Sequence, residues 1–224
     1  MNKEKIIKGL KWFFHSYIWV GIVLLVLDII SKNIVVNVAS KEGDSVTLIP
    51  GFLSFTYVVN RHAAFGIGPE DPTASRILYI CIASIASVGI SIWFAKGHKK
   101  MPGYVRAALM IIVAGALGNM IDRIFYTSEY LKVAPGLSPG VVDFIDFFNG
   151  GPLESLWHYI FNIADCGVVI GTFMLLIWMI IDEVKNYKER KQKEAAEGKV
   201  EDKTKVLSET EKRKLEEQEQ NRAE

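Results

Sequence analysis

Four long apolar runs dominate this chain of 224 residues and restrict what it can fold into. The runs cover residues 17–38, 77–95, 105–125 and 159–181 and contain few charged side chains. Each can cross the roughly 30 Å hydrocarbon layer of a bilayer as a helix, which takes about 20 residues. None has the strict alternation of apolar and polar residues that a membrane strand requires. The sequence therefore predicts an all-α membrane protein with four transmembrane helices.

The positions of the lysines predict how these helices are oriented. Seven lysines lie before the first run or between the second and third runs: Lys3, Lys5, Lys8, Lys11, Lys96, Lys99 and Lys100. Cytoplasmic segments of membrane proteins carry an excess of Lys and Arg. Both termini are therefore predicted to be cytoplasmic, and the connections at residues 39–75 and 126–158 are predicted to lie outside.

The first outer connection predicts a small β element. Residues 46–59 hold two segments rich in β-branched and aromatic residues on either side of Pro50 and Gly51, which is typical of a strand, a turn and a second strand. The expected fold is thus four helices with an extracytoplasmic β element between helices one and two. Residues 1–184 are expected to form the membrane core, and residues 185–224 a charged cytoplasmic tail that cannot bury a core of its own.

Charge, cysteine and histidine usage exclude several classes of function. The formal net charge of +1 does not indicate a nucleic-acid partner. Cys81 and Cys166 lie inside predicted spans, where they are expected to be small buried side chains. The four histidines lack the paired spacing of a zinc site: His15, His62, His98 and His158. Neither a metal nor another cofactor is therefore expected.

Polar side chains inside the third and fourth runs are functional candidates, because a charge near the bilayer centre costs about 2.5–3.5 kcal/mol. Asn119, Asp122 and Arg123 are three and four residues apart, so they share a helix face. Asn162 and Asp165 form a second pair of this kind. With the predicted orientation, both groups lie at the outer ends of their helices.

Two charged pairs are interpreted as structural support. Asp28 and Lys32 are one turn apart in the first run, where an intrahelical ion pair would lower the cost of both charges. Arg123 could bridge Asp122 and a backbone carbonyl and so tie the helix end to the external loop.

Asp143 and Asp146 lie in an apolar segment just before the fourth run. If this segment is helical, Asp146 lies one turn from Asp143 and is a rival for the same role, although the order of the motifs favours Asp143. If Asp143 folds back onto the end of the bundle, it would face Asp165. Two neighbouring carboxylates cannot both ionise cheaply, so one can act as a base towards water and the other as an acid, as an aspartic peptidase requires. Three asparagines would then hold substrate backbone or orient the carboxylates: Asn60, Asn119 and Asn162.

Two other functions compete with a peptidase. A small proton-coupled carrier could use a relay of Asp28, Lys32, Asp122, Arg123 and Asp165. Such a relay should cross the membrane, whereas these residues collect in the outer half. A non-catalytic scaffold would explain one or two of the polar groups as interhelical hydrogen bonds, but not the whole set.

Five motifs occur in order along the predicted elements: Asp28-Ile29-Ile30-Ser31-Lys32, Asn60 to Gly66, Gly115 to Arg123, Val141-Val142-Asp143-Phe144 and Phe161-Asn162-Ile163-Ala164-Asp165. Together they resemble the lipoprotein signal peptidases, also called signal peptidase II, which are membrane aspartic peptidases that process bacterial prolipoproteins. His62 and Cys166 depart from the residues that this family usually has at those positions.

The resemblance implies roles for ten residues. Asp143 and Asp165 would be the catalytic dyad. The substrate site would be lined by Asn60, Gly115, Asn119, Arg123 and Asn162, with support from Asp28, Lys32 and Asp122. The implied substrate is a diacylglyceryl-modified prolipoprotein, cleaved on the amino side of its lipidated cysteine at the outer face of the bacterial cytoplasmic membrane. A monomer among membrane lipids is also expected, and the resemblance implies sensitivity to globomycin.

Overall fold

The chain forms two compact units, Met1–Leu175 and Leu176–Glu224, which are described separately. The computed structural model describes side chains up to residue 195 and the backbone of residues 3–61, 69, 71–134, 136–157 and 159–223. His62, one of the departures from the family motif, lies outside these residues.

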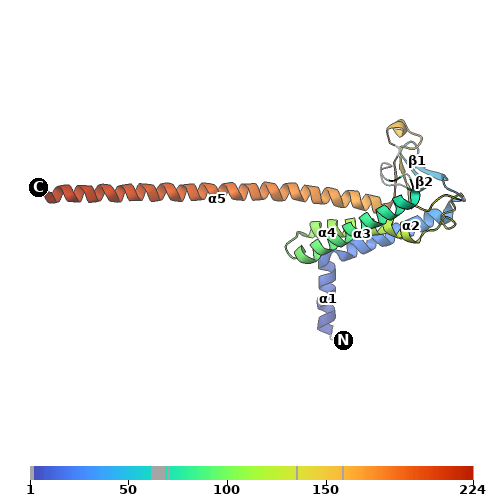
Figure 1. Cartoon of the computed structure of the whole chain (residues 1–224), viewed down its shortest axis with the longest axis horizontal. Coiled ribbons are helices and arrows are strands. Elements are labelled where there is room, and N and C mark those ends of the chain that lie inside the picture. The colour runs from blue at the N-terminus through green and yellow to red at the C-terminus, as the bar shows by residue number, and fades with distance from the viewer. Residues whose placement is uncertain (1–2, 62–68, 70, 135, 158, 224) are drawn as a thin grey trace. The chain divides into compact units, whose positions relative to one another are not determined.

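Among the described residues, four helices are long and apolar enough to cross a membrane, which confirms the four predicted runs. They are α2 (Ile18–Val38), α3 (Pro72–Gly97), α4 (Gly103–Phe125) and the Ile163–Ala195 part of α5 (Ile163–Ala223). Helix α3 begins earlier than predicted because the Asp71 side chain caps it, accepting from the Ala74 N–H at 2.7 Å. Helices α2, α3 and α4 lie side by side (Figure 1).

A separate helix, α1 (Lys3–Ser16), precedes the first membrane helix. The two are divided at Tyr17, whose φ of 64° lies in the left-handed region that side chains other than glycine rarely adopt. Ser16 closes the corner: its hydroxyl donates to the Phe13 carbonyl at 2.7 Å and accepts from the Ile18 N–H at 3.3 Å. The sequence pattern did not distinguish α1 as an element of its own.

The predicted β element is present but is only half of the sheet. Residues Ser45–Ile49 (β1) and Leu53–Asn60 (β2) pair antiparallel, as expected for 46–59. The sheet continues with β3 (Val141–Phe147) and β4 (Ile160–Phe161), in the order β1-β2-β3-β4. The structure is thus mostly helical with one small antiparallel sheet, and the connection between α4 and α5 adds two strands that the sequence pattern did not reveal.

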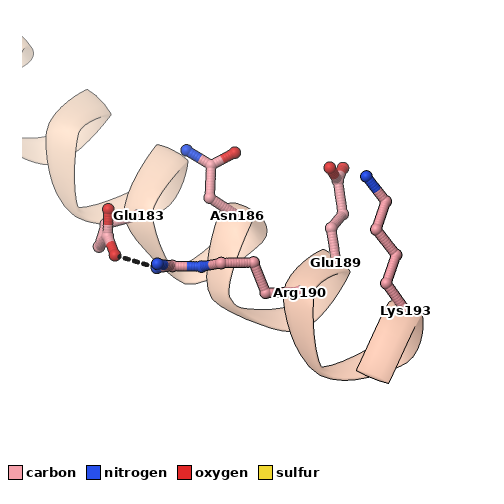
Figure 2. A pocket seen from close by; sticks show the side chains of 5 residues that line it. All are labelled: Glu183, Asn186, Glu189, Arg190 and Lys193. Atoms are coloured by element: carbon pink, nitrogen blue, oxygen red, sulfur yellow. Dashed lines mark hydrogen bonds and ion pairs between the residues drawn. The ribbon is translucent and has the colours of Figure 1, made fainter. Parts of the chain in front are cut away.

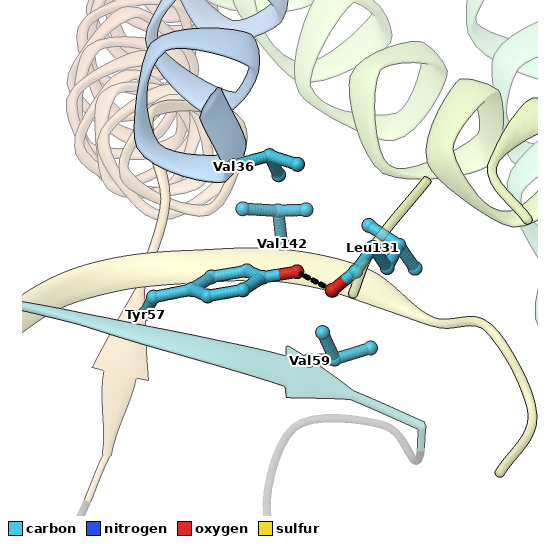
Figure 3. Close-up of a cluster of buried hydrophobic side chains, with 5 residues drawn as sticks. All are labelled: Val36, Tyr57, Val59, Leu131 and Val142. Atoms are coloured by element: carbon cyan, nitrogen blue, oxygen red, sulfur yellow. Dashed lines mark hydrogen bonds between the residues drawn. The ribbon is translucent and has the colours of Figure 1, made fainter. Parts of the chain in front are cut away.

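A buried apolar cluster joins the end of α2 to the sheet. Figure 3 shows its five members converging: Val36, Tyr57, Val59, Leu131 and Val142. The Tyr57 hydroxyl donates to the Leu131 carbonyl at 2.5 Å, which satisfies both groups inside the cluster. The cluster thereby fixes β2 and β3 against the helix bundle.

Tyr57→Phe is expected to lower the free energy of unfolding by about 1–3 kcal/mol, because the buried Leu131 carbonyl loses the hydroxyl that donates to it. Thermal unfolding in detergent, followed by near-UV circular dichroism, measures the effect. Tyr104→Phe is the matched control, since Tyr104 is 44% exposed. Equal stability of the two variants would contradict the assigned role of the Tyr57 hydroxyl.

The second unit is helical and carries mostly charged side chains. A shallow hollow on it is lined by Glu183, Asn186, Glu189, Arg190 and Lys193 (Figure 2). All five residues belong to one stretch of α5, and Glu183 pairs with Arg190 at 2.8 Å on the surface. This is a solvated helix face of mixed charge, and it holds no arrangement of groups that suggests chemistry.

Candidate active site

Asp143 lies on β3 and is only 2% exposed. Two asparagine amides hold its carboxylate: Asn60 Nδ2 donates to Oδ2 at 2.9 Å, and Asn162 Nδ2 donates to Oδ1 at 2.6 Å. Asn60 ends β2, which pairs with β3 and brings the two side chains together. The pairing of β2 with β3 therefore places Asp143 beside the start of α5.

Asp165 lies in the first turn of α5, and Asn162 caps that turn. The Asp165 N–H donates to Asn162 Oδ1 at 2.8 Å, and the Asn162 N–H donates to Asp165 Oδ2 at 3.2 Å. This reciprocal arrangement is that of a capping box, and a helix N-terminus favours a negative side chain. The predicted fourth helix was placed to begin at 159, but residues before Asn162 belong to β4 because the cap starts the helix at Ile163.

A line of amides connects the two carboxylates. Asn119 Nδ2 donates to Asp165 Oδ1 at 2.7 Å, and Asn119 Oδ1 accepts from Asn162 Nδ2 at 3.0 Å. Asn162 in turn donates to Asp143. Burial, and then the neighbouring charge of Asp165, raise the pKa of Asp143 to about 7. The structure thus brings together the two carboxylates and the three asparagines that the sequence singled out.

A buried ammonium group lies behind this site. Lys32, Asp28 and Asp122 are all fully buried, and Lys32 Nζ is 2.8 Å from Asp28 Oδ2 and 3.0 Å from Asp122 Oδ2. The predicted Asp28–Lys32 ion pair is confirmed, and it extends to α4. Lys32 Nζ also donates to Asn119 Oδ1 at 3.0 Å, which turns the Asn119 amide nitrogen towards Asp165.

The two carboxylates paired with Lys32 each hold the backbone next to a candidate catalytic residue. Asp122 Oδ2 accepts from the Val142 N–H at 3.1 Å, one residue before Asp143. Asp28 Oδ1 accepts from the Ala164 N–H at 2.8 Å, one residue before Asp165. The charged group behind the site therefore connects α2 and α4 to both acidic residues.

Comparison with known proteins agrees with this geometry. Residues 20–181 match the sequence model of the family described as signal peptidase (SPase) II. The chain belongs to this family. A lipoprotein signal peptidase from Fusobacterium nucleatum is 34% identical over 162 residues, which cover 72% of this chain and 84% of that protein. One from Clostridium tetani is 33% identical over 174 residues, covering 76% and 97%.

A solved bacterial membrane enzyme has the same fold as this signal peptidase II family member. It superposes with a TM-score of 0.59 at 29% identity, over 76% of this chain and 91% of that one. A second such structure gives a TM-score of 0.56 at 30% identity, over 75% and 94%. The family match supports the peptidase and not the alternative of a carrier.

Asp146, the rival for membership of the acidic pair, belongs to a different network. Its Oδ2 accepts from Thr56 Oγ1 and from Asn149 Nδ2, each at 2.7 Å. Because β3 is a strand, residues three apart point to opposite faces, which separates Asp146 from Asp143. In this signal peptidase II chain the segment is a strand. A helix would instead have placed Asp143 and Asp146 on one face.

Gly115 and Arg123 lie on α4 beside the acidic residues. A Cβ at Gly115 would collide with the Ala164 carbonyl and would lie 2.7 Å from a Val168 methyl, so glycine allows α4 and α5 to approach next to Asp165. Arg123 Nη1 donates to the Asn119 carbonyl at 3.3 Å, and its guanidinium lies over the Tyr79 ring at 5.1 Å. This carbonyl belongs to the same helix as Arg123, so the contact does not test the expected link from the helix end to the external loop.

Sequence reasoning missed a brace at the end of β2. Arg61 donates to Glu42 Oε1 at 3.0 Å and to Oε2 at 2.8 Å, and its Nε donates to the Ser138 carbonyl at 3.0 Å. Burial raises the pKa of Glu42, but bonds from Arg61 and the Val59 N–H outweigh it and hold that pKa below its usual value. These bonds fix the backbone next to Asn60. The one sign of them in the sequence is that Arg61 directly follows Asn60.

Proposed function

We propose that this chain is a membrane aspartic endopeptidase that removes the signal peptide from diacylglyceryl-modified bacterial prolipoproteins. The observation that carries the proposal is the pair of acidic residues, Asp143 and Asp165, joined through Asn162 and Asn119 at the end of the helix bundle. Family membership supplies the substrate class. Cleavage takes place on the amino side of the lipidated cysteine.

Each acidic residue has a role in the reaction. The ionised carboxylate removes a proton from water, the water oxygen attacks the scissile carbonyl, and the protonated carboxyl transfers its proton so that the amine can leave. The pKa of Asp143, raised to about 7, favours a pair that shares one proton near neutral pH. Water is consumed and no covalent intermediate forms. One carboxylate gains a proton while the other carboxyl loses one, so the pair holds as many protons after the reaction as before it.

The asparagines act mainly by orienting these carboxylates. Asn60, Asn119 and Asn162 donate to Asp143 or Asp165, which fixes the directions of the remaining oxygen lone pairs. Arg123 lies on α4 beside the carboxylates of Asp143 and Asp165. Together with Gly115 on the same helix, it is proposed to contact the substrate backbone. Asp28, Lys32 and Asp122 are proposed to hold the acidic residues in place from behind.

The proposed placement in the membrane follows from the lysines and from the substrate. We place both termini in the cytoplasm and the sheet outside, so that the acidic pair lies at the outer face of the cytoplasmic membrane. A scissile bond next to a diacylglyceryl anchor lies at that depth. The enzyme is proposed to work as a monomer, with residues 1–184 as the peptidase core and 185–224 as a solvated cytoplasmic extension.

Cleavage of a purified prolipoprotein by the detergent-solubilised protein tests the function. The diacylglyceryl-modified substrate is expected to be cut, while the same substrate without the lipid is expected to remain intact. Globomycin is expected to block the reaction. Failure to cut the modified substrate, in protein shown to be folded, would remove the peptidase assignment, and equal cleavage of both substrates would remove the proposed dependence on the lipid.

The pH dependence of kcat/KM is expected to be bell-shaped. A raised carboxyl pKa means that the proton is held below about pH 7 and lost above it. Activity should therefore fall on the alkaline side as the pair loses its shared proton, and on the acid side as the second carboxylate becomes protonated. Initial rates across a pH series, with unfolding monitored in parallel, measure this. A rate that keeps rising well above about pH 8 would contradict a shared proton.

A further inference from the structure

Helix α1 has two distinct faces. With successive residues about 100° apart around a helix, five of its six large apolar side chains fall in one sector: Ile6, Ile7, Leu10, Phe13 and Phe14. The opposite side carries most of its charge: Glu4, Lys5, Lys8, Lys11 and His15. This pattern is typical of a helix with one face in an apolar environment and the other in water.

The apolar face of α1 is not covered by the described part of its own unit. Ile7 is 46% exposed, Leu10 57% and Phe14 56%. A contiguous apolar stripe of this kind in contact with water marks an interaction surface. The described part of the bundle therefore leaves the apolar face of α1 open to a binding partner.

The direction of α1 is fixed by the bundle. Three donors satisfy carbonyls in its last turn: Ser16 Oγ to Phe13 at 2.7 Å, Trp19 Nε1 to Phe14 at 3.3 Å and Arg106 Nη1 to His15 at 2.6 Å. The Arg106 guanidinium also lies over the Tyr17 ring at 5.3 Å. A Cβ at Gly103 would lie 2.5 Å from the Tyr17 hydroxyl, so a larger residue there would displace the Tyr17 side chain. These contacts make the corner a fixed joint that connects α1, α2 and α4.

The joint turns α1 away from the axis of the membrane helices. Figure 1 shows α1 leaving the end of α2 at a steep angle, while α2, α3 and α4 run along one common direction. When these three helices stand across a bilayer, α1 lies along its surface. Because only Tyr17 separates the end of α1 from the start of α2, α1 lies at the depth where the hydrocarbon starts.

We propose that α1 is an interfacial helix that binds an anionic phospholipid surface. Its apolar sector enters the boundary between headgroups and acyl chains, and its lysines contact the headgroup phosphates. Four lysines against one glutamate give the helix the positive charge that such a surface selects. Trp12 lies on the lysine side, and tryptophan is enriched at this level of a membrane. This lipid contact fixes how deeply α2 lies in the membrane. The lipid surface that α1 binds is at the end of the bundle opposite the sheet.

Cysteine labelling of the full-length protein tests the proposal without using peptidase activity. Leu10→Cys reports the apolar face, and Lys8→Cys is the matched control on the opposite side of α1. Each variant is placed in nanodiscs that hold one copy, and its reaction rate with a water-soluble maleimide is measured. The parent chain gives the background from Cys81 on α3, which is exposed and not buried as the sequence suggested, and from the partly buried Cys166 on α5.

In discs that contain phosphatidylglycerol, Lys8→Cys is expected to react about tenfold faster than Leu10→Cys. In discs of phosphatidylcholine alone, the ratio is expected to shrink severalfold because the electrostatic attraction is lost. Equal rates at the two positions in anionic discs would overturn the proposal, and so would a ratio independent of lipid charge. Protection of Leu10→Cys only in discs with two copies would also overturn it, because the occupant would then be a second chain.

Discussion

Asp143→Asn and Asp165→Asn are each expected to reduce cleavage of the lipidated substrate by at least about 10²–10⁴-fold, the usual contribution of a positioned acid or base. An amide can neither accept the proton of the attacking water nor supply one to the leaving amine. Asp146→Asn is the matched control from the same strand, since its partners are Thr56 and Asn149. It is expected to retain activity within severalfold of the unaltered protein.

Folding must be separated from chemistry in this comparison. An amide nitrogen at position 143 would face the donors Asn60 Nδ2 and Asn162 Nδ2, so one of these hydrogen bonds is lost whichever way the amide turns. Thermal unfolding of all three variants in the same detergent measures that effect. Full activity after loss of either Asp143 or Asp165, or loss of activity in the Asp146 variant at unchanged stability, would refute the assignment of the acidic pair.

The membrane helices could be predicted because hydropathy is a local property of the sequence. About twenty apolar residues in succession have few alternatives to a membrane helix. The break at Tyr17 could not be predicted, because its left-handed backbone is not signalled by glycine or proline. The Tyr17 side chain packs against Arg106 and Gly103, which lie far along the chain on α4.

The sheet was only half predicted because strand pairing is not local. Residues 46–59 form a hairpin around a Pro-Gly turn that the sequence displays. Strand β3 pairs with β2 across a long stretch of chain, for example Val59 with Val142. Its two aspartates made the segment an unusual strand by composition. One of them, Asp143, is tolerated there because amides satisfy both of its oxygens.

Most members of the site were predicted, but most of the contacts between different helices were not. The spacing of Asp122, Asn119 and Asp165 identifies helix faces, yet it does not specify which carboxylate pairs with which cation. The sequence favoured pairs within one helix, such as Asp28 with Lys32. The structure adds the links from Lys32 to Asp122 and Asn119 on α4, and the links from the two carboxylates to the backbone beside Asp143 and Asp165.

Lys32→Met is expected to reduce kcat by a factor of about 100 or more in folded protein while leaving KM nearly unchanged. The substitution removes the donor to Asn119, so the Asn119 amide no longer has a fixed orientation towards Asp165. It also leaves Asp28 and Asp122 buried without their cation, which is expected to cost about 3–5 kcal/mol of stability. Lys132→Met is the matched control, because Lys132 is exposed and donates to the Ala39 carbonyl.

A second variant keeps this prediction testable if the first does not fold. Asp28→Asn combined with Lys32→Met removes one buried charge of each sign, and the new amide at position 28 can still accept from the Ala164 N–H through its side-chain oxygen. Stability should recover in part because fewer buried charges lack a partner. Activity should remain low, because Asn119 still lacks the ammonium that orients it. A double variant with the kcat of the unaltered protein would mean that Lys32 only balances charge, whereas low kcat at restored stability would identify it as the residue that positions the acidic pair.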